Sequence, residues 1–200
     1  MIHEAILEHF VGALGRPVRS KELPRARGFE PRVTVHEWDR TAFGFRAFAT
    51  VGFAENRHHG AEASHRVEFI LAVKQMGIDT AAWALQVATT TPIEDRLTPR
   101  SGDTIGLPKP ISGSRGIQRL LLTDRWGDEK LRRLDIAELS VHVLMAVPIF
   151  ECELGFLRST DEPGFWAAVE REKLDMTDLT RGPLKKGEGF IVQRETVKRH

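Results

Sequence analysis

The run from Ser140 to Ile149 constrains the fold of this chain more than any other feature of its sequence. It is dense in valine, leucine, methionine and isoleucine, and Pro148 stands near its end. An apolar run of this length is typical of a strand that is covered on both faces. We therefore expect these residues to form a buried, central strand of a sheet.

Residue spacing predicts the remaining elements. Alternating apolar and polar residues indicate strands, and apolar residues recurring every three to four positions indicate helices. The predicted strands are 33–38 and 43–50, joined as a hairpin by a turn near 39–42, then 67–73 and 117–123. The predicted helices run from Ile2 to Leu14, from Asp79 to a point before Thr89, and beyond Pro163 and Gly164 along the face of Phe165 and Val169. Residues 21–32 and 128–134 are expected to be connectors, the second with room for a helical turn.

Composition sets the class of protein. The 200 residues are enough for one core, and 29 basic against 28 acidic residues argue against a polyanionic partner such as nucleic acid. A single cysteine, Cys152, can form neither an intramolecular disulfide nor a thiolate metal site, which favours a reducing compartment. The chain lacks a signal-peptide pattern and any apolar window of membrane-spanning length. We expect a cytoplasmic protein that does not cross or bind a membrane.

The usual enzyme motifs are missing from the sequence. The glycines at 113 and 116 fit neither nucleotide-binding pattern, and no GxSxG or HExxH motif occurs. We therefore predict a protein without enzymatic activity and without a cofactor.

Histidines form the one local group of metal-ligand residue types. His58, His59 and His65 lie in or just after a polar loop over 55–64. Adjacent histidines in a loop rarely face one ion, and no helical ligand spacing is present, so we predict no metal site.

Two acids give an alternative function. Glu151 and Glu153 would share one face if they lay in a strand, and paired carboxylates can do acid–base chemistry. The alternative is a small cytoplasmic enzyme of unknown substrate that uses His36, His65 or this pair. We expect instead that both glutamates are solvated or structural and that Cys152 packs in the interior.

The segment from Arg100 to Asp124 offers the best candidate binding surface. Ser101-Gly102-Asp103 has a turn composition, Thr104 starts an extended run, and prolines at 108 and 110 limit that run to a sheet edge or a loop. Carboxylates at Asp103 and Asp124 thus bracket an exposed edge, and such edges accept a partner's strand. We predict partner-binding residues at Gly102, Asp103, Thr104 and Asp124. The alternative is that Asp103 only caps the turn and Asp124 is a solvated strand end.

The order of these pieces resembles the suppressor of fused family. The family has a Ser-Gly-Asp turn, a proline-containing segment, Ile-Gln, and Leu-Leu-Thr followed by an acid. Downstream it has an acid-leucine step, a helix, and a Thr-Asp run that ends in Arg-Gly. Here the matching residues are Ser101-Gly102-Asp103, Pro110, Ile117-Gln118, Leu121-Leu122-Thr123-Asp124, Glu153-Leu154 and Thr177-Asp178-Leu179-Thr180-Arg181-Gly182.

The resemblance implies an α+β fold, a mixed β-sheet with packed α-helices, and a non-enzymatic function. In animal members the domain holds a peptide of a transcription factor as an added strand, and the acids at Asp103 and Asp124 match contact positions. Two other contact positions depart from the animal pattern, at Pro108 and near Thr91, which implies a different ligand. The chain looks like the single-domain bacterial members, which implies an immunity protein that neutralises a toxin by binding it.

Three segments are predicted. Residues 1–32 are expected to form an N-terminal helix and connector, residues 33–184 the suppressor-of-fused-like domain, and residues 185–200 a C-terminal tail that frays beyond Gln193.

Overall fold

The structure is a computed structural model, and it describes residues 2–24, 32–39, 44–55, 65–95, 97–126 and 129–185, with only the backbone of His65. The predicted turn at 40–42, most of the 55–64 loop, His58, His59 and the tail beyond Lys185 lie outside the described residues.

One eight-stranded sheet organises the described chain. Its elements in chain order are α1 (Ile2–Leu14), β1 (Arg19–Glu22), β2 (Thr34–Trp38), β3 (Arg46–Val51), the 3-10 helix η1 (Phe53–Glu55), β4 (His65–Val73), α2 (Ile78–Glu94), β5 (Thr104–Gly106), β6 (Arg119–Thr123), α3 (Glu129–Arg132), β7 (Arg133–Ile136), β8 (Leu139–Ile149) and α4 (Glu151–Glu172).

The strand order is β1-β2-β3-β4-β8-β6-β5, and β7 also pairs with β8. All neighbours are antiparallel except β4 and β8, which run parallel, so the sheet is mixed. The run from Ser140 to Ile149 therefore is an interior strand, as expected, and the fold is α+β.

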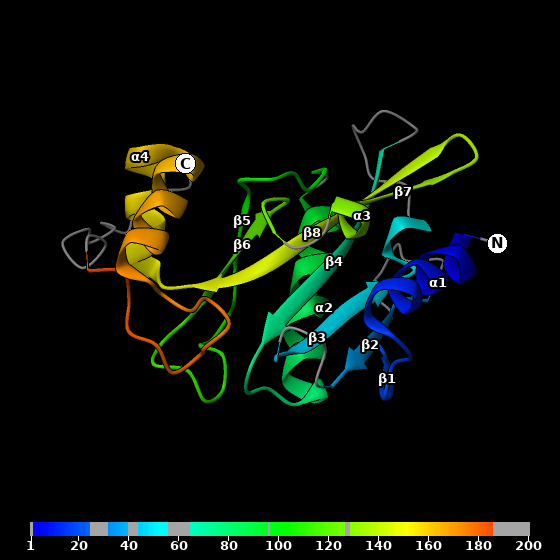
Figure 1. Ribbon diagram of the computed structural model, residues 1–200, viewed down its shortest axis with the longest axis horizontal. Helices are drawn as coiled ribbons and strands as arrows, with labels where there is room; N and C mark the ends of the chain where they lie inside the picture. The colour runs from blue at the N-terminus through cyan, green and yellow to red at the C-terminus, as the bar shows by residue number, and fades with distance from the viewer. Residues whose placement is uncertain are drawn as a thin grey trace, which may run out of the picture.

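Helices cover both faces of this sheet (Figure 1). Helix α2 lies behind the sheet in that view and packs against the largest core cluster, which includes Leu144 and Ala146 of β8. On the opposite face, α1 packs beside Val141 and Val143, and α4 packs beside Val147 and Ile149. Successive residues of β8 thus point to opposite faces, and apolar partners meet both, as its composition predicts.

Two strands were not predicted. Residues 21–32 were expected to be an irregular connector, but β1 extends to Glu22 and pairs with β2. Residues 128–134 contain the short helix α3, and β7 starts at Arg133. All four side chains of β1 are exposed because β1 is at the sheet edge, so its pairing left no apolar alternation in the sequence. Strand β7 has only two apolar residues, Leu134 and Ile136, which is too short an alternation to indicate a strand.

Two helix boundaries also differ. Helix α2 was expected to end before Thr89 but continues through Pro92 to Glu94. Pro92 lies in the last turn, so its missing N–H removes one hydrogen bond near an end that frays in any case. Helix α4 begins at Glu151 instead of after Gly164, and Asp161 interrupts it with φ of 70°. The Asp161 carboxylate accepts a 2.8 Å hydrogen bond from the N–H of Gly164, so the second half starts where the sequence indicated.

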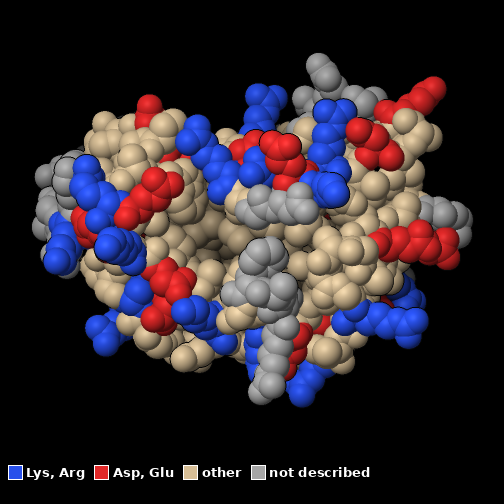
Figure 2. Space-filling model, viewed as in Figure 1, with Lys and Arg blue, Asp and Glu red and all other residues tan. Residues whose placement is uncertain are grey.

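No helix in the described part of the chain is both long enough and apolar enough to cross a membrane. Lysine, arginine, aspartate and glutamate are interspersed on the face shown in Figure 2. This mixture agrees with the near-zero formal charge of the whole chain.

Candidate functional site: an acidic turn beside an open strand edge

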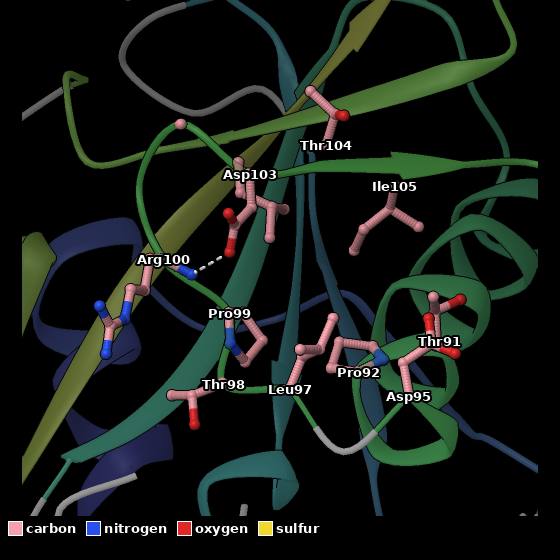
Figure 3. A pocket seen from close by; sticks show the side chains of 12 residues that line it. Thr91, Pro92, Asp95, Leu97, Thr98, Pro99, Arg100, Asp103, Thr104 and Ile105 are labelled. Carbon is pink, nitrogen blue, oxygen red and sulfur yellow. Dashed lines mark hydrogen bonds between the residues drawn. The ribbon is translucent and has the colours of Figure 1, made fainter. Parts of the chain in front are cut away.

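The Ser101-Gly102-Asp103 turn immediately precedes β5 and is hydrogen-bonded to the end of β6. Gly102 has φ of +91°, a conformation that favours glycine, and its N–H donates to the Leu122 carbonyl at 2.8 Å. Leu122 returns a 2.8 Å hydrogen bond from its N–H to the Asp103 carbonyl. The carboxylate of Asp103 accepts the Arg100 N–H at 2.8 Å (Figure 3). Asp103 therefore does cap the turn, and its side chain remains exposed.

Asp124 contacts the same turn from the end of β6. Its Oδ1 accepts a 2.9 Å hydrogen bond from the Ser101 hydroxyl, and its N–H donates to that hydroxyl oxygen at 3.1 Å. The sequence separates Asp103 from Asp124 by two strands and a proline-containing segment, and the turn brings both to one end of the β5–β6 pair. Ser101, which sequence reasoning did not single out, joins them.

A third carboxylate, Glu162, comes from α4. Its Oε1 accepts hydrogen bonds from the Thr123 hydroxyl at 2.5 Å and the Trp166 indole N–H at 3.2 Å, and its Oε2 lies 3.3 Å from the Ser101 hydroxyl. Glu162 follows the break at Asp161, which redirects α4 at this position. Asp103, Asp124 and Glu162 are called the acidic cluster below. Sequence reasoning missed Glu162, and its one signal was the Pro163-Gly164 helix break.

Strand β5 leaves one side open beside this cluster. Among the described residues it is the last strand of the sheet and pairs only with β6. Before β5, the Asp103 carbonyl accepts the N–H of Leu122 in β6, and after β5 the Leu107 N–H donates to the carbonyl of Gln118, the residue before β6. Antiparallel pairing alternates bonded and non-bonded residues, so the N–H and C=O groups of Thr104 and Gly106 point away from β6. The proline-limited edge expected here is therefore present.

A pocket of about 620 Å³ lies along the inner face of this edge, between β5 and the end of α2. Pro92, Leu97 and Ile105 give it apolar walls, and Asp103 stands on its rim (Figure 3). We call it the edge pocket. It could hold one apolar side chain of an extended segment paired with β5.

The proposed glutamate pair does not exist as a dyad. Glu151 and Glu153 lie in the first turn of α4, and residues two apart on a helix do not face each other. Glu151 binds the guanidinium of Arg119 at 2.5 and 3.0 Å on the surface. Glu153 is completely buried and binds Arg181 at 2.6 and 2.9 Å. Each acid has a separate structural partner, as the sequence analysis favoured.

The other candidate groups are also accounted for. His36 is buried beside Ser20, whose hydroxyl lies 2.8 Å from its Nδ1. Burial and the nearby charge of His3 lower the pKa of His36, so it is neutral near pH 7. Cys152 is half-buried and packs against the core that α2 covers. The described residues contain no group of three histidine, cysteine, aspartate or glutamate side chains placed to hold a metal, and the side chains of His58, His59 and His65 lie outside them.

Comparison with known proteins identifies the fold. Three solved structures are similar, each at 14% sequence identity and over 92% of this chain. They are a SUFU homologue from Neisseria gonorrhoeae (TM-score 0.66, 96% of that chain), a Sufu–Fu complex (0.69, 93%) and Drosophila Suppressor of Fused (0.62), of which this chain spans 50%. No curated protein sequence matches. The family model for Suppressor of fused protein (SUFU) matches residues 30–182, so the chain belongs to the suppressor of fused family.

Proposed function

We propose that this protein is a non-enzymatic protein-binding module that holds an extended segment of a partner along β5. The observation that carries the proposal is the open edge of β5 placed between the acidic cluster and the edge pocket. Thr104 and Gly106 supply outward backbone groups for strand pairing, and Gly102 lets the turn form without strain.

Charge and shape define the partner's segment. Side chains of an added strand alternate between the two faces of the sheet. Ile105 and the edge pocket lie on the α2 face, whereas Thr123 and Glu162 lie on the α4 face. The segment should therefore carry an apolar residue toward the pocket and a lysine or arginine on the neighbouring position, toward Asp124 and Glu162.

The biological role we propose is that of a bacterial immunity protein. It acts in the cytoplasm, where its one cysteine stays reduced, and neutralises a toxin by occupying a basic surface on it. The similar Sufu–Fu structure is a complex between proteins, which supports a binding function for this fold. The proline at 108 and the threonine at 91 depart from the animal pattern, which supports a partner other than the animal one.

The test uses substitutions that separate binding from folding. Asp103→Asn and Asp124→Asn keep the hydrogen bonds to Arg100 and Ser101 within reach, so the turn should survive and melting temperatures should stay close to wild type. Binding to the basic partner domain, sought first among toxin-like genes adjacent to this one, should weaken by about tenfold or more in each, most strongly at low salt. Glu170→Gln removes an exposed charge from α4 and is the matched control. Wild-type affinity in both Asn variants would show that these acids are not the interface.

A second pair of variants tests strand addition. Gly106→Pro deletes an outward N–H while leaving the bonds from Ile105 and Leu107 to β6 in place, and proline is tolerated in edge strands at such positions. Gly106→Ala keeps the N–H, and the added Cβ meets only the flexible end of Arg119 at 3.4 Å. The proline variant should lose binding and the alanine variant should keep it. Equal binding by the two folded variants would contradict strand addition.

A further inference from the structure

A gap, called the notch below, separates β6 from β7 along β8, and Asp124 lies beside it at the end of β6. Strand β6 pairs with β8 from Met145 to Ile149, and β7 pairs with β8 from Leu139 to His142. Strand β4 pairs with residues 140–145 of β8 and occupies the opposite edge, so β6 and β7 share one edge and stop short of each other. A cavity of about 290 Å³ lies in this gap, with Leu144 among its lining residues.

Basic side chains from separate segments converge on this cavity. Arg100 comes from the segment before the turn, Arg132 from the end of α3, Arg133 from the start of β7 and His142 from β8. Asp124 is the one carboxylate among the lining residues. In Figure 3 the Arg100 side chain points away from Ile105 and Pro92, so it does not fill the edge pocket.

Two of the guanidinium groups form hydrogen bonds through Nε. Arg132 donates its Nε–H to the Trp126 carbonyl at 2.8 Å, and Arg133 donates its Nε–H to Asp135 at 2.9 Å. A guanidinium anchored through Nε presents its terminal nitrogens as a planar fork, which matches the paired oxygens of phosphate. Asp135 offsets the charge of Arg133, and Asp124 is the second nearby carboxylate, so the three arginines leave the notch with a small excess of positive charge.

We propose that this notch, lined by Arg100, Arg132, Arg133 and His142, is a binding site for a phosphate-type oxyanion. The ligand is either free phosphate or the phosphoryl group of a larger molecule. The site adjoins the acidic cluster and shares Asp124 with it, but binds a group of opposite charge. Asp124 repels that anion, whereas it attracts the basic partner segment.

Inorganic phosphate titrated calorimetrically into the full chain, at constant ionic strength set with chloride, tests the proposal. Wild type should bind with a Kd in the millimolar range or below. Arg100→Gln and Arg133→Gln should each weaken binding about fivefold, and the double variant by more. Arg171→Gln removes the same charge from an exposed position on α4 and should bind as wild type does. Absence of phosphate binding by wild type, or equal losses in the control and the notch variants, would overturn the proposal.

Asp124→Asn distinguishes this site from the partner-binding edge. Removing the repelling carboxylate should tighten phosphate binding, about threefold, whereas the same change should weaken binding of the basic partner. Phenyl phosphate identifies the source of the anion: binding as tight as that of inorganic phosphate indicates a phosphoryl group on a larger molecule, and much weaker binding indicates the free ion. Unchanged phosphate affinity in Asp124→Asn would contradict the proposed location of the site.

Discussion

The ion pair between Glu153 and Arg181 should dominate the stability of the α4 end of the molecule. Arg181→Met removes the guanidinium while keeping an unbranched apolar side chain of similar length. Glu153 is 0% exposed and Arg181 is 7% exposed, so the substitution leaves a carboxylate buried without its counter-charge. Glu153 also accepts the N–H groups of Phe150 and Leu184, both at 2.8 Å, which fixes the start of α4 to the chain after it.

The size of the effect follows from this burial. Removing one partner of a buried ion pair lowers the free energy of unfolding by about 3–5 kcal/mol, because the remaining charge stays buried without a counter-charge. The pair has two short N–O contacts, and Arg181 also donates to the Pro148 carbonyl at 3.0 Å and lies over the Phe150 ring. For a chain of this size the loss corresponds to a fall in melting temperature of about 6–20 °C.

Urea denaturation of five proteins measures the prediction. Arg181→Met, Glu153→Gln and the double variant form a cycle with wild type, and Arg171→Met on the exposed side of α4 is the control. The double variant should be at least about 1 kcal/mol more stable than the sum of the single losses predicts, because it no longer leaves one charge buried alone. A cost below about 1 kcal/mol for Arg181→Met, or strictly additive losses, would refute the reasoning.

Two further predictions concern pH and metals. Burial raises the pKa of Glu68 to about 8 against the hydrogen bonds it receives from Thr50, Gly52 and Ala54, so the folded state binds its proton more tightly than the unfolded chain does. The free energy of unfolding should therefore fall as pH rises from about 4.5 to 8, by up to about 1.4 kcal/mol per pH unit. Urea titrations at several pH values should show a weaker pH dependence of stability for Glu68→Gln than for wild type. Identical pH dependence in the two proteins would contradict the raised pKa. Addition of EDTA should leave the melting temperature unchanged, and a fall of many degrees would revive a metal site at His58, His59 and His65.

The sequence predicted those elements whose side chains carry the packing pattern. Val67–Val73 and Ser140–Ile149 are apolar because both faces of their strands are covered, and α1 shows its buried Ile6 and Phe10 at helical spacing. Strand β1 gave no such signal, because all four of its side chains are exposed, and β7 offered only two apolar residues, Leu134 and Ile136, which are partly buried against the core beside α1. Exposed edge pairing is therefore the part of this fold that local patterns could not predict.

The candidate site was predictable only in part, because some of its contacts join residues that are far apart in the sequence. Asp103 and Asp124 flank short recognisable strands, so their place at the β5–β6 edge could be inferred from spacing. Glu162 accepts a hydrogen bond from Thr123, which is 39 residues away in the sequence, and Arg181 binds Glu153, which is 28 residues away. These contacts depend on where the break at Asp161 directs α4, which no local pattern specifies. The segment boundaries at residues 32 and 184 stay a prediction.

The family motifs acquire a physical meaning in this structure. The acid-leucine step at Glu153 and the run ending at Arg181 meet in one buried ion pair, so the downstream motif serves folding. Ser101 and Asp124 of the upstream motif meet at the open edge, where their exposed groups can serve binding. Substitutions in the two motifs should therefore separate loss of stability from loss of binding.

Amide hydrogen exchange at β5 tests strand addition most directly. The N–H groups of Thr104 and Gly106 point away from β6 and should exchange rapidly in the isolated protein, whereas that of Ile105 should be protected by pairing with Leu120. Addition of the proposed partner domain at saturating concentration should slow exchange at Thr104 and Gly106 by about a hundredfold or more, with little change at Ile105. If the partner binds while both outward amides exchange as fast as in the free protein, the bound segment does not pair with β5.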